Sequence, residues 1–117
     1  LKNRTLDDLY SHPSSGNSWE GFVIEQIIGI IPQYWQSFFY RTSAGAEIDL
    51  LLLDHRNESI AVEIKYSLSP KVEKGFWNGM GDLGCKKGFV IYPGDEIYPI
   101  GKDVFALPVK NMMRIFE

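Results

Sequence analysis

The stretch Gly45-Ala46-Glu47-Ile48-Asp49-Leu50-Leu51-Leu52-Leu53, followed by Ser59-Ile60-Ala61-Val62-Glu63-Ile64-Lys65, decides the fold. Charged and apolar side chains alternate in both segments with a period of two residues, which is typical of β-strands. Residues 54–58, which separate the two segments, are polar and predict a reversal of the chain. The pattern therefore predicts strands over 46–53 and 59–66, paired as an antiparallel hairpin.

A reversal centred on Arg56 sets the register of this hairpin, because it places Asp49 opposite Glu63 and Glu47 opposite Lys65. Directly opposed side chains lie on one face of a sheet, about 5 Å apart at Cβ. The three acids and the lysine would therefore gather on one face. The opposite face would be the core, made of Ile48, Leu50, Leu52, Ile60, Val62 and Ile64.

The charged face has two interpretations. Three acids and one lysine on a strand pair can form a solvated face with cross-strand ion pairs. However, Leu51 and Leu53 follow Asp49 in phase, which indicates that another element covers this face. Opposed carboxylates also repel each other, and a divalent cation such as Mg²⁺ would relieve that repulsion by binding their oxygens. A solvated ion-pair face and a metal site at the edge of a covered cleft both remain open.

A helix is predicted before the hairpin, over residues 19–31, with Ser18 as its N-cap and Pro32 as its stop. Positions 20, 24, 27 and 31 form one stripe of this helix, in which Glu20 precedes three isoleucines. An acid in the first turn either interacts favourably with the helix dipole or points at a site as a ligand. Both interpretations of Glu20 remain open.

The remaining chain completes a mixed α/β pattern. An aromatic-rich strand over 34–42 gives, with the hairpin, an antiparallel meander of three strands. A second helix is predicted from Ser69-Pro70 to about residue 83, with Pro70 near its first position. Strands over 88–92 and 104–107 and a terminal helical turn over 110–116 follow. This order predicts a central mixed β-sheet flanked by helices.

Composition narrows the class of protein. The 117 residues are enough for one domain, and the formal net charge is −3. A single cysteine, Cys85, and two histidines argue against disulfides and a structural zinc site. No apolar run is long enough to cross a bilayer, so we expect a cytoplasmic protein without a membrane partner. Because the chain opens at Leu1, residues 1–17 are interpreted as a lead-in from an absent N-terminal part and residues 18–117 as the domain.

Several motifs together resemble a nuclease superfamily. They are Gly45-Ala46-Glu47-Ile48-Asp49, Glu63-Ile64-Lys65, the Trp19-Glu20-Gly21-Phe22-Val23 helix and Tyr40-Arg41. Their content and order resemble the core of the PD-(D/E)XK, or restriction-endonuclease-like, superfamily, with Ile48 where the superfamily name has proline. More narrowly, the chain resembles the uncharacterised nuclease-like domain at the C-terminus of many prokaryotic AAA-type ATPases. That likeness rests on His12-Pro13, Trp19-Glu20 and Lys87-Gly88-Phe89-Val90.

The resemblance implies a restriction-endonuclease-like fold and metal-dependent hydrolysis of phosphodiester bonds in DNA. Asp49, Glu63 and the backbone carbonyl of Ile64 would hold Mg²⁺ or Mn²⁺. Lys65 would serve the attacking water and the phosphate, and Glu20 would be a further acid of the catalytic set, beside the metal. Glu47 is expected to support the site. The metal would lower the pKa of the water and offset charge that develops at phosphorus.

Three other cations and two alternative functions complete the expectations. Arg41, Lys71 and Lys74 are candidates for holding phosphates, with surface solubility as their alternative role. A catalytically silent interaction or regulatory module with the same fold is the alternative to a nuclease, and the net charge of −3 favours it. A third possibility is a different domain in which the acids are structural. The chain has no Gly-x-x-x-x-Gly-Lys motif, so any ATPase partner is another domain of the parent chain.

Overall fold

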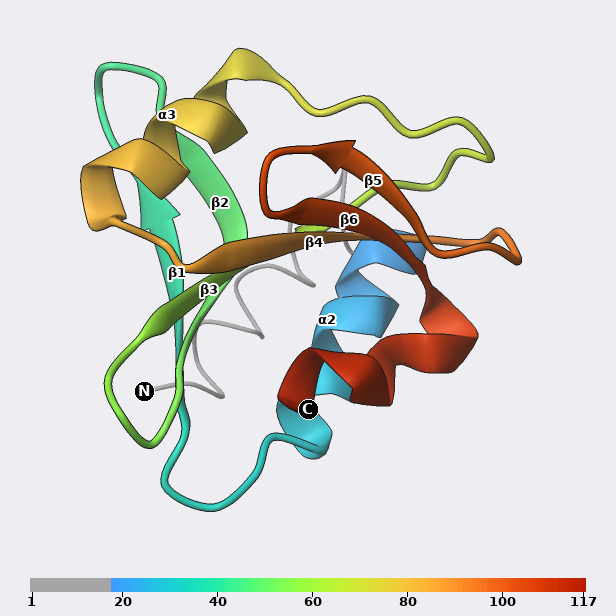
Figure 1. The fold of residues 1–117 in the computed structure, drawn as a ribbon, viewed down its shortest axis with the longest axis horizontal. Coiled ribbons are helices and arrows are strands. Elements are labelled where there is room, and N and C mark those ends of the chain that lie inside the picture. Colours follow the sequence, from blue (N-terminus) through green and yellow to red (C-terminus); the bar gives the residue numbers. More distant parts are fainter. Residues whose placement is uncertain (1–17) are drawn as a thin grey trace.

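The computed structural model describes residues 18–117, and the predicted lead-in over 1–17 lies outside the described residues. The elements in chain order are α2 (Trp19–Gly29), β1 (Gln36–Arg41), β2 (Glu47–Leu53), β3 (Ser59–Ile64), α3 (Lys74–Leu83), β4 (Lys87–Tyr92), β5 (Tyr98–Gly101), β6 (Val104–Pro108) and the 3-10 helix η1 (Val109–Phe116). The strands form one open sheet in the order β1-β2-β3-β4-β6-β5 (Figure 1). Helix α2 and η1 cover one face and α3 covers the other. The predicted α/β class with a mixed sheet flanked by helices is confirmed.

The first three strands form the predicted antiparallel meander, and the predicted hairpin register is confirmed from Leu50–Val62 to Leu53–Ser59. After α3, β4 pairs parallel with β3, and β6 pairs parallel with β4. The sequence pattern does not predict β5, an edge strand that contains Pro99 and pairs antiparallel with β6. Proline weakens a strand signal but is tolerated at a sheet edge, so the pattern missed a real strand.

Helix α2 begins and packs as predicted. The Ser18 side chain accepts a hydrogen bond from the Gly21 N–H at 3.0 Å, which satisfies one amide of the first turn. The buried residues Val23, Ile24 and Ile27 pack against the sheet, with Ile31 partly buried against the same core. No helix within residues 18–117 has the length and apolar character needed to cross a membrane.

Helix α3 begins later than predicted. Pro70 is buried in the segment that precedes the helix, and the first helical residue is Lys74. The helix depends on packing, because Phe76 and Met80 are buried against the sheet while glycines weaken the helix itself. It therefore begins where that packing begins and not at the proline.

Gly75 allows the first turn of α3 to approach the loop before β2. A Cβ atom at Gly75 would lie 2.5 Å from the backbone oxygen of Gly45. We expect Gly75→Ala to lower the free energy of unfolding by about 1–3 kcal/mol, because backbone must move. Gly81→Ala is the control within the same helix. Its Cβ would meet nothing within 4 Å, and alanine should raise stability by up to about 1 kcal/mol. Urea unfolding measures both, and equal effects would contradict the close approach.

Candidate functional site

A β-bulge in β2 positions Asp49. The pairing of β1 with β2 shifts between Phe38 and Tyr40, so that two residues of β2, Asp49 and Leu50, lie opposite one residue of β1. An extra residue of this kind bends the strand and re-aims its side chains. The bulge therefore places the Asp49 side chain where β2 begins to separate from β3.

The bulge also changes which face Ile48 occupies. Ile48 was predicted to share a core face with Leu50 and Leu52, and this prediction is wrong. It is buried with Leu51 in the cluster under α3, whereas Leu50 and Leu52 pack under α2. The prediction assumed that side chains alternate regularly between the two faces of the sheet. One extra residue in a strand reverses the face of each strand residue that precedes it.

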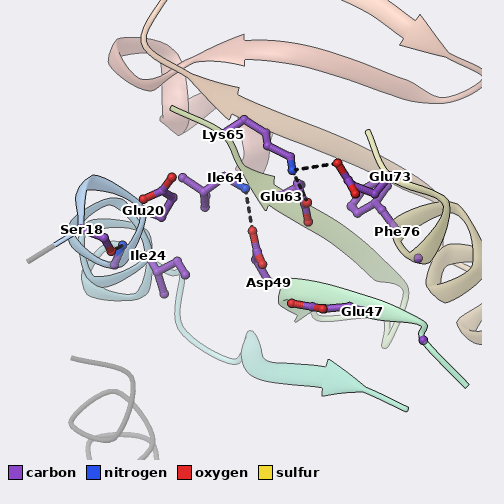
Figure 2. A pocket seen from close by; sticks show the side chains of 13 residues that line it. Ser18, Glu20, Ile24, Glu47, Asp49, Glu63, Ile64, Lys65, Glu73 and Phe76 are labelled. Carbon is purple, nitrogen blue, oxygen red and sulfur yellow. Dashed lines mark hydrogen bonds and ion pairs between the residues drawn. The ribbon is translucent and has the colours of Figure 1, made fainter. Parts of the chain in front are cut away.

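The Asp49 carboxylate binds the main chain of β3. Its Oδ2 atom accepts a hydrogen bond from the Ile64 N–H at 2.9 Å (Figure 2). The β2–β3 ladder stops at Leu50–Val62, one position short of the predicted Asp49–Glu63 pair. Because the N–H and C=O of one strand residue point to the same side, the Ile64 carbonyl also faces Asp49. Two kinds of oxygen, carboxylate and carbonyl, therefore meet at the end of the ladder.

Glu63 and Lys65 lie on either side of Ile64 at the carboxyl end of β3. Glu63 is only 8% exposed, and its Oε2 lies 3.5 Å from Lys65 Nζ. Lys65 Nζ also lies 3.9 Å from Glu73 Oε2. Glu47 was predicted to lie opposite Lys65 in the hairpin, but it pairs with Arg41 instead. The fold thus holds Lys65 between the buried Glu63 and the exposed Glu73.

Glu73 is a site residue that sequence reasoning missed. It precedes Lys74 at the N-cap position of α3, with extended backbone and no side-chain capping bond. Its carboxylate reaches Lys65 because the segment 65–73 folds back to the strand end (Figure 2). No spacing in the sequence signals this contact, because residues 69–73, which were predicted to begin the helix, are irregular in the structure.

These groups surround one cavity of about 540 Å³. It lies between the first turn of α2, the first turn of α3 and the ends of β2 and β3 (Figure 2). Its lining consists of Ser18, Glu20, Gly21, Ile24, Gly45, Glu47, Asp49, Glu63, Ile64, Lys65, Glu73, Gly75 and Phe76. Five carboxyl groups and one ammonium group therefore share this space.

Burial raises the pKa of both inner carboxyl groups. For Asp49, loss of water is the largest effect, and the bond from the Ile64 N–H opposes it. For Glu63, loss of water and the nearby Asp49 charge raise the pKa to about 8, against the opposing charge of Lys65. Glu63 therefore retains a proton at neutral pH when no further positive charge is near.

Glu20 and Glu47 both line the cavity but differ in their surroundings. Glu20 is partly buried in the first turn of α2 and projects beside Ile64 (Figure 2). Glu20 thus lines the same cavity as the inner acids, and its part in the catalytic set stays a prediction. Glu47 is half exposed and accepts a hydrogen bond from Arg41 at 2.9 Å, which neutralises it at the rim.

The three predicted phosphate-binding cations lie outside the cavity lining. Arg41 is engaged by Glu47, with its side chain 77% exposed. Lys71 and Lys74 are exposed on the segment before α3 and in its first turn. Contacts between these lysines and phosphate stay a prediction.

The oxygen atoms of two carboxylates in this cavity are ligands of the kind that a hard divalent cation prefers. Within residues 18–117, no group of three or more histidine, cysteine or acidic side chains converges closely enough to hold a metal. Ligation of a metal by Glu20 as a third acid stays a prediction. Asp49, Glu63 and the Ile64 carbonyl supply oxygen ligands, and magnesium typically completes such a set with water.

The raised pKa of Glu63 predicts how stability depends on pH. In the unfolded chain glutamate titrates near pH 4.3, whereas folded Glu63 titrates near pH 8. Between these two pH values the folded state binds more protons than the unfolded state. The free energy of unfolding should therefore fall by a few kcal/mol as pH rises from about 5 to about 8. Glu63→Gln should remove this component. Urea unfolding in chelator at several pH values tests it, and parallel profiles for both proteins would contradict it.

Comparisons with known proteins place the chain in a family. A family profile described as Domain of unknown function (DUF4143) matches residues 15–112. The chain is similar to Uncharacterized protein Mb2031c of Mycobacterium bovis and Uncharacterized protein Rv2008c of Mycobacterium tuberculosis, each 29% identical over 111 residues. Each match covers 92% of this chain but only 25% of the relative, so the chain spans about a quarter of their length. No solved structure matches it significantly. Since the profile covers most of its length, the chain belongs to the DUF4143 family.

Proposed function

We propose that this domain is a metal-dependent phosphodiesterase of the restriction-endonuclease-like type, acting on DNA. The observation that carries the proposal is the convergence of Asp49 with Glu63-Ile64-Lys65 at one cavity. Two neighbouring carboxylates, one of them buried, a carbonyl and a lysine are the groups needed to hold a divalent cation next to a phosphate. Perturbed acids in a cleft are also typical of functional sites.

The order of the elements supports a restriction-endonuclease-like fold. A helix, three antiparallel strands, a second helix and a strand parallel to the third follow in the order on which the resemblance rests. The acidic residues lie at the ends of the second and third strands, where the motif residues are expected. The shorter strands β5 and β6 extend the sheet on the side of β4 that is away from the cavity.

Asp49, Glu63 and the Ile64 carbonyl would hold Mg²⁺ or Mn²⁺. When bound, such an ion lowers the pKa of water and offsets negative charge at phosphorus. It would also hold Glu63 in its ionised form, because an adjacent positive charge lowers the pKa of a carboxyl group. The proton that Glu63 holds at neutral pH would be released on binding.

The other residues have roles that follow from their positions. The Lys65 ammonium group, held by Glu63, can donate hydrogen bonds to a phosphate oxygen and to the attacking water. A phosphate that arrives here must displace the weaker contact with the exposed Glu73. Glu20 would orient water beside the inner acids, and Glu47 would hold Arg41 at the rim.

We infer that the domain works as part of a larger protein. About three quarters of each mycobacterial relative lies outside the matched segment. An AAA-type ATPase domain in the parent chain, with this domain C-terminal to it, is the arrangement that the resemblance implies. ATP-driven movement of DNA would then bring substrate to the cavity.

Metal binding and cleavage test the proposal. Magnesium or manganese should raise the melting temperature, since a ligand present at roughly 100 times its Kd adds about 2.7 kcal/mol of stability. Asp49→Ala should abolish the rise and any nicking of DNA. Lys65→Ala should keep metal binding but suppress nicking, because it removes the group that serves phosphate and water. Calorimetric titration with a manganese-supported nicking assay measures both.

Glu58→Gln is the matched control for removal of a carboxylate. Glu58 forms a 2.9 Å ion pair with Lys86 at the surface and does not line the cavity. Its loss should leave metal binding and nicking unchanged. If the wild-type domain binds no divalent ion at millimolar concentration and nicks no DNA, the catalytic proposal fails. The interaction module with the same fold would then be the better account.

A further inference from the structure

An exposed aromatic pair lies next to the cavity. Trp19 directly precedes Glu20, and Tyr66 directly follows Lys65, and both of these charged residues line the cavity. The Trp19 and Tyr66 rings contact each other, with centroids 5.2 Å apart and planes inclined at 38°. The pair therefore joins the start of α2 to the end of β3 beside the catalytic lysine.

The two rings have different surroundings. Trp19 is partly buried and packs against the core between α2 and the sheet. Tyr66 is 68% exposed, so most of its surface remains in contact with water after it packs on Trp19. Trp19 thus anchors the pair, and Tyr66 presents a supported ring to an incoming ligand.

The charge around the cavity does not suit a ligand held by its phosphates. Within residues 18–117 the cavity lining contains five acids and one lysine, and the whole chain has a net charge of −3. Binding of duplex DNA depends strongly on lysine and arginine contacts to phosphate, each of which releases counterions. Arg41, at the cavity rim, is already engaged by Glu47. One bound divalent ion would offset only part of this negative charge.

Single-stranded DNA offers a different source of affinity. Its bases are not held in pairs, and stacking on aromatic side chains contributes about 1–3 kcal/mol per base with little dependence on sequence. Neighbouring residues are about 3.8 Å apart at Cα. Tyr66 follows Lys65 in the chain and contacts Trp19, which precedes Glu20, and both Lys65 and Glu20 line the cavity, so a base on Tyr66 would belong to a nucleotide at the edge of the cavity.

We propose that the site acts on single-stranded DNA, and that Tyr66, supported by Trp19, stacks an unpaired base next to the phosphate to be cleaved. This inference rests on the proposed function, because it names the substrate class of the same cavity. Tyr66 is a substrate-positioning residue here, and Lys65 and the acids keep their roles.

Binding of three probes tests the inference. They are a single-stranded oligothymidylate about 12 nucleotides long, its duplex with oligoadenylate, and an abasic strand of the same length. Fluorescence anisotropy in calcium, an ion that also takes oxygen ligands, measures their affinities. The single strand should bind at least about ten-fold more tightly than the abasic strand and the duplex, since one stacked base corresponds to about 1.4 kcal/mol or more.

Variants separate stacking from general packing. Tyr66→Ala should weaken single-strand binding about ten-fold, and Tyr66→Phe should restore it because the ring is kept. Tyr66→Leu keeps an apolar contact with Trp19 but no ring face, so it should resemble alanine. Tyr34→Ala is the control, because Tyr34 is 80% exposed and does not line the cavity. Thermal melting of each variant checks that it folds.

The outcomes distinguish this inference from the proposed function. Equal binding of the three probes, no binding of any probe, or no effect of Tyr66→Ala would overturn the stacking role. Efficient nicking of duplex in manganese with an unaffected Tyr66→Ala variant would do the same while the phosphodiesterase proposal stands. Conversely, Tyr66-dependent binding of the single strand without any cleavage would support the stacking role of Tyr66 and contradict the proposed phosphodiesterase activity.

Discussion

The hydrogen bond from the Ile64 N–H to the Asp49 carboxylate is the interaction on which the candidate site depends. It ends the β2–β3 ladder, and the bulge in β2 provides the geometry for it. Without this acceptor, the amide of buried Ile64 at the carboxyl end of β3 would lack this partner, at a cost of about 1–3 kcal/mol. Asp49 is therefore both a structural residue and a site residue. The same contact that completes the sheet leaves a carboxylate and a carbonyl facing one cavity.

The electrostatics of the cavity follow from this arrangement. Partly buried Asp49 and buried Glu63 share it with three other acids, and among residues 18–117 Lys65 is the single cation in its lining. Burial raises the pKa of both Asp49 and Glu63, and repulsion from Glu47 adds to the shift at Asp49 while repulsion from Asp49 adds to the shift at Glu63, so the site holds a proton at neutral pH. Acids with raised pKa values lower the stability of the folded protein at neutral pH. Such a loss of stability is typical of groups placed for function.

The carboxyl end of β3 brings several kinds of chemistry together within four consecutive residues. Glu63 supplies a buried carboxyl group, Ile64 a main-chain peptide, Lys65 an ammonium group and Tyr66 an exposed ring. Glu63 and Lys65 form an ion pair on one side, whereas Tyr66, beyond the end of the strand, contacts Trp19 of α2. The first turns of α2 and α3 then close the cavity from two sides, which is possible because Gly75 allows backbone to approach backbone. A rigid buried strand thus carries the chemistry, and the helices define the opening.

The sequence by itself determined the local elements and most of the candidate site. Period-two alternation, the Ser18 cap and the polar reversal at 54–58 were sufficient for the meander, for α2 and for the hairpin register from Leu50–Val62 to Leu53–Ser59, because these depend on neighbouring residues. Asp49, Glu63 and Lys65 stood out because they interrupt apolar strands. Only the tertiary structure decided the face of Ile48, the start of α3 after a buried Pro70, the edge strand β5 and the contact of Glu73 with Lys65. Each of these depends on a bulge, an edge position or a fold-back between distant segments, and no periodicity in the chain encodes such contacts.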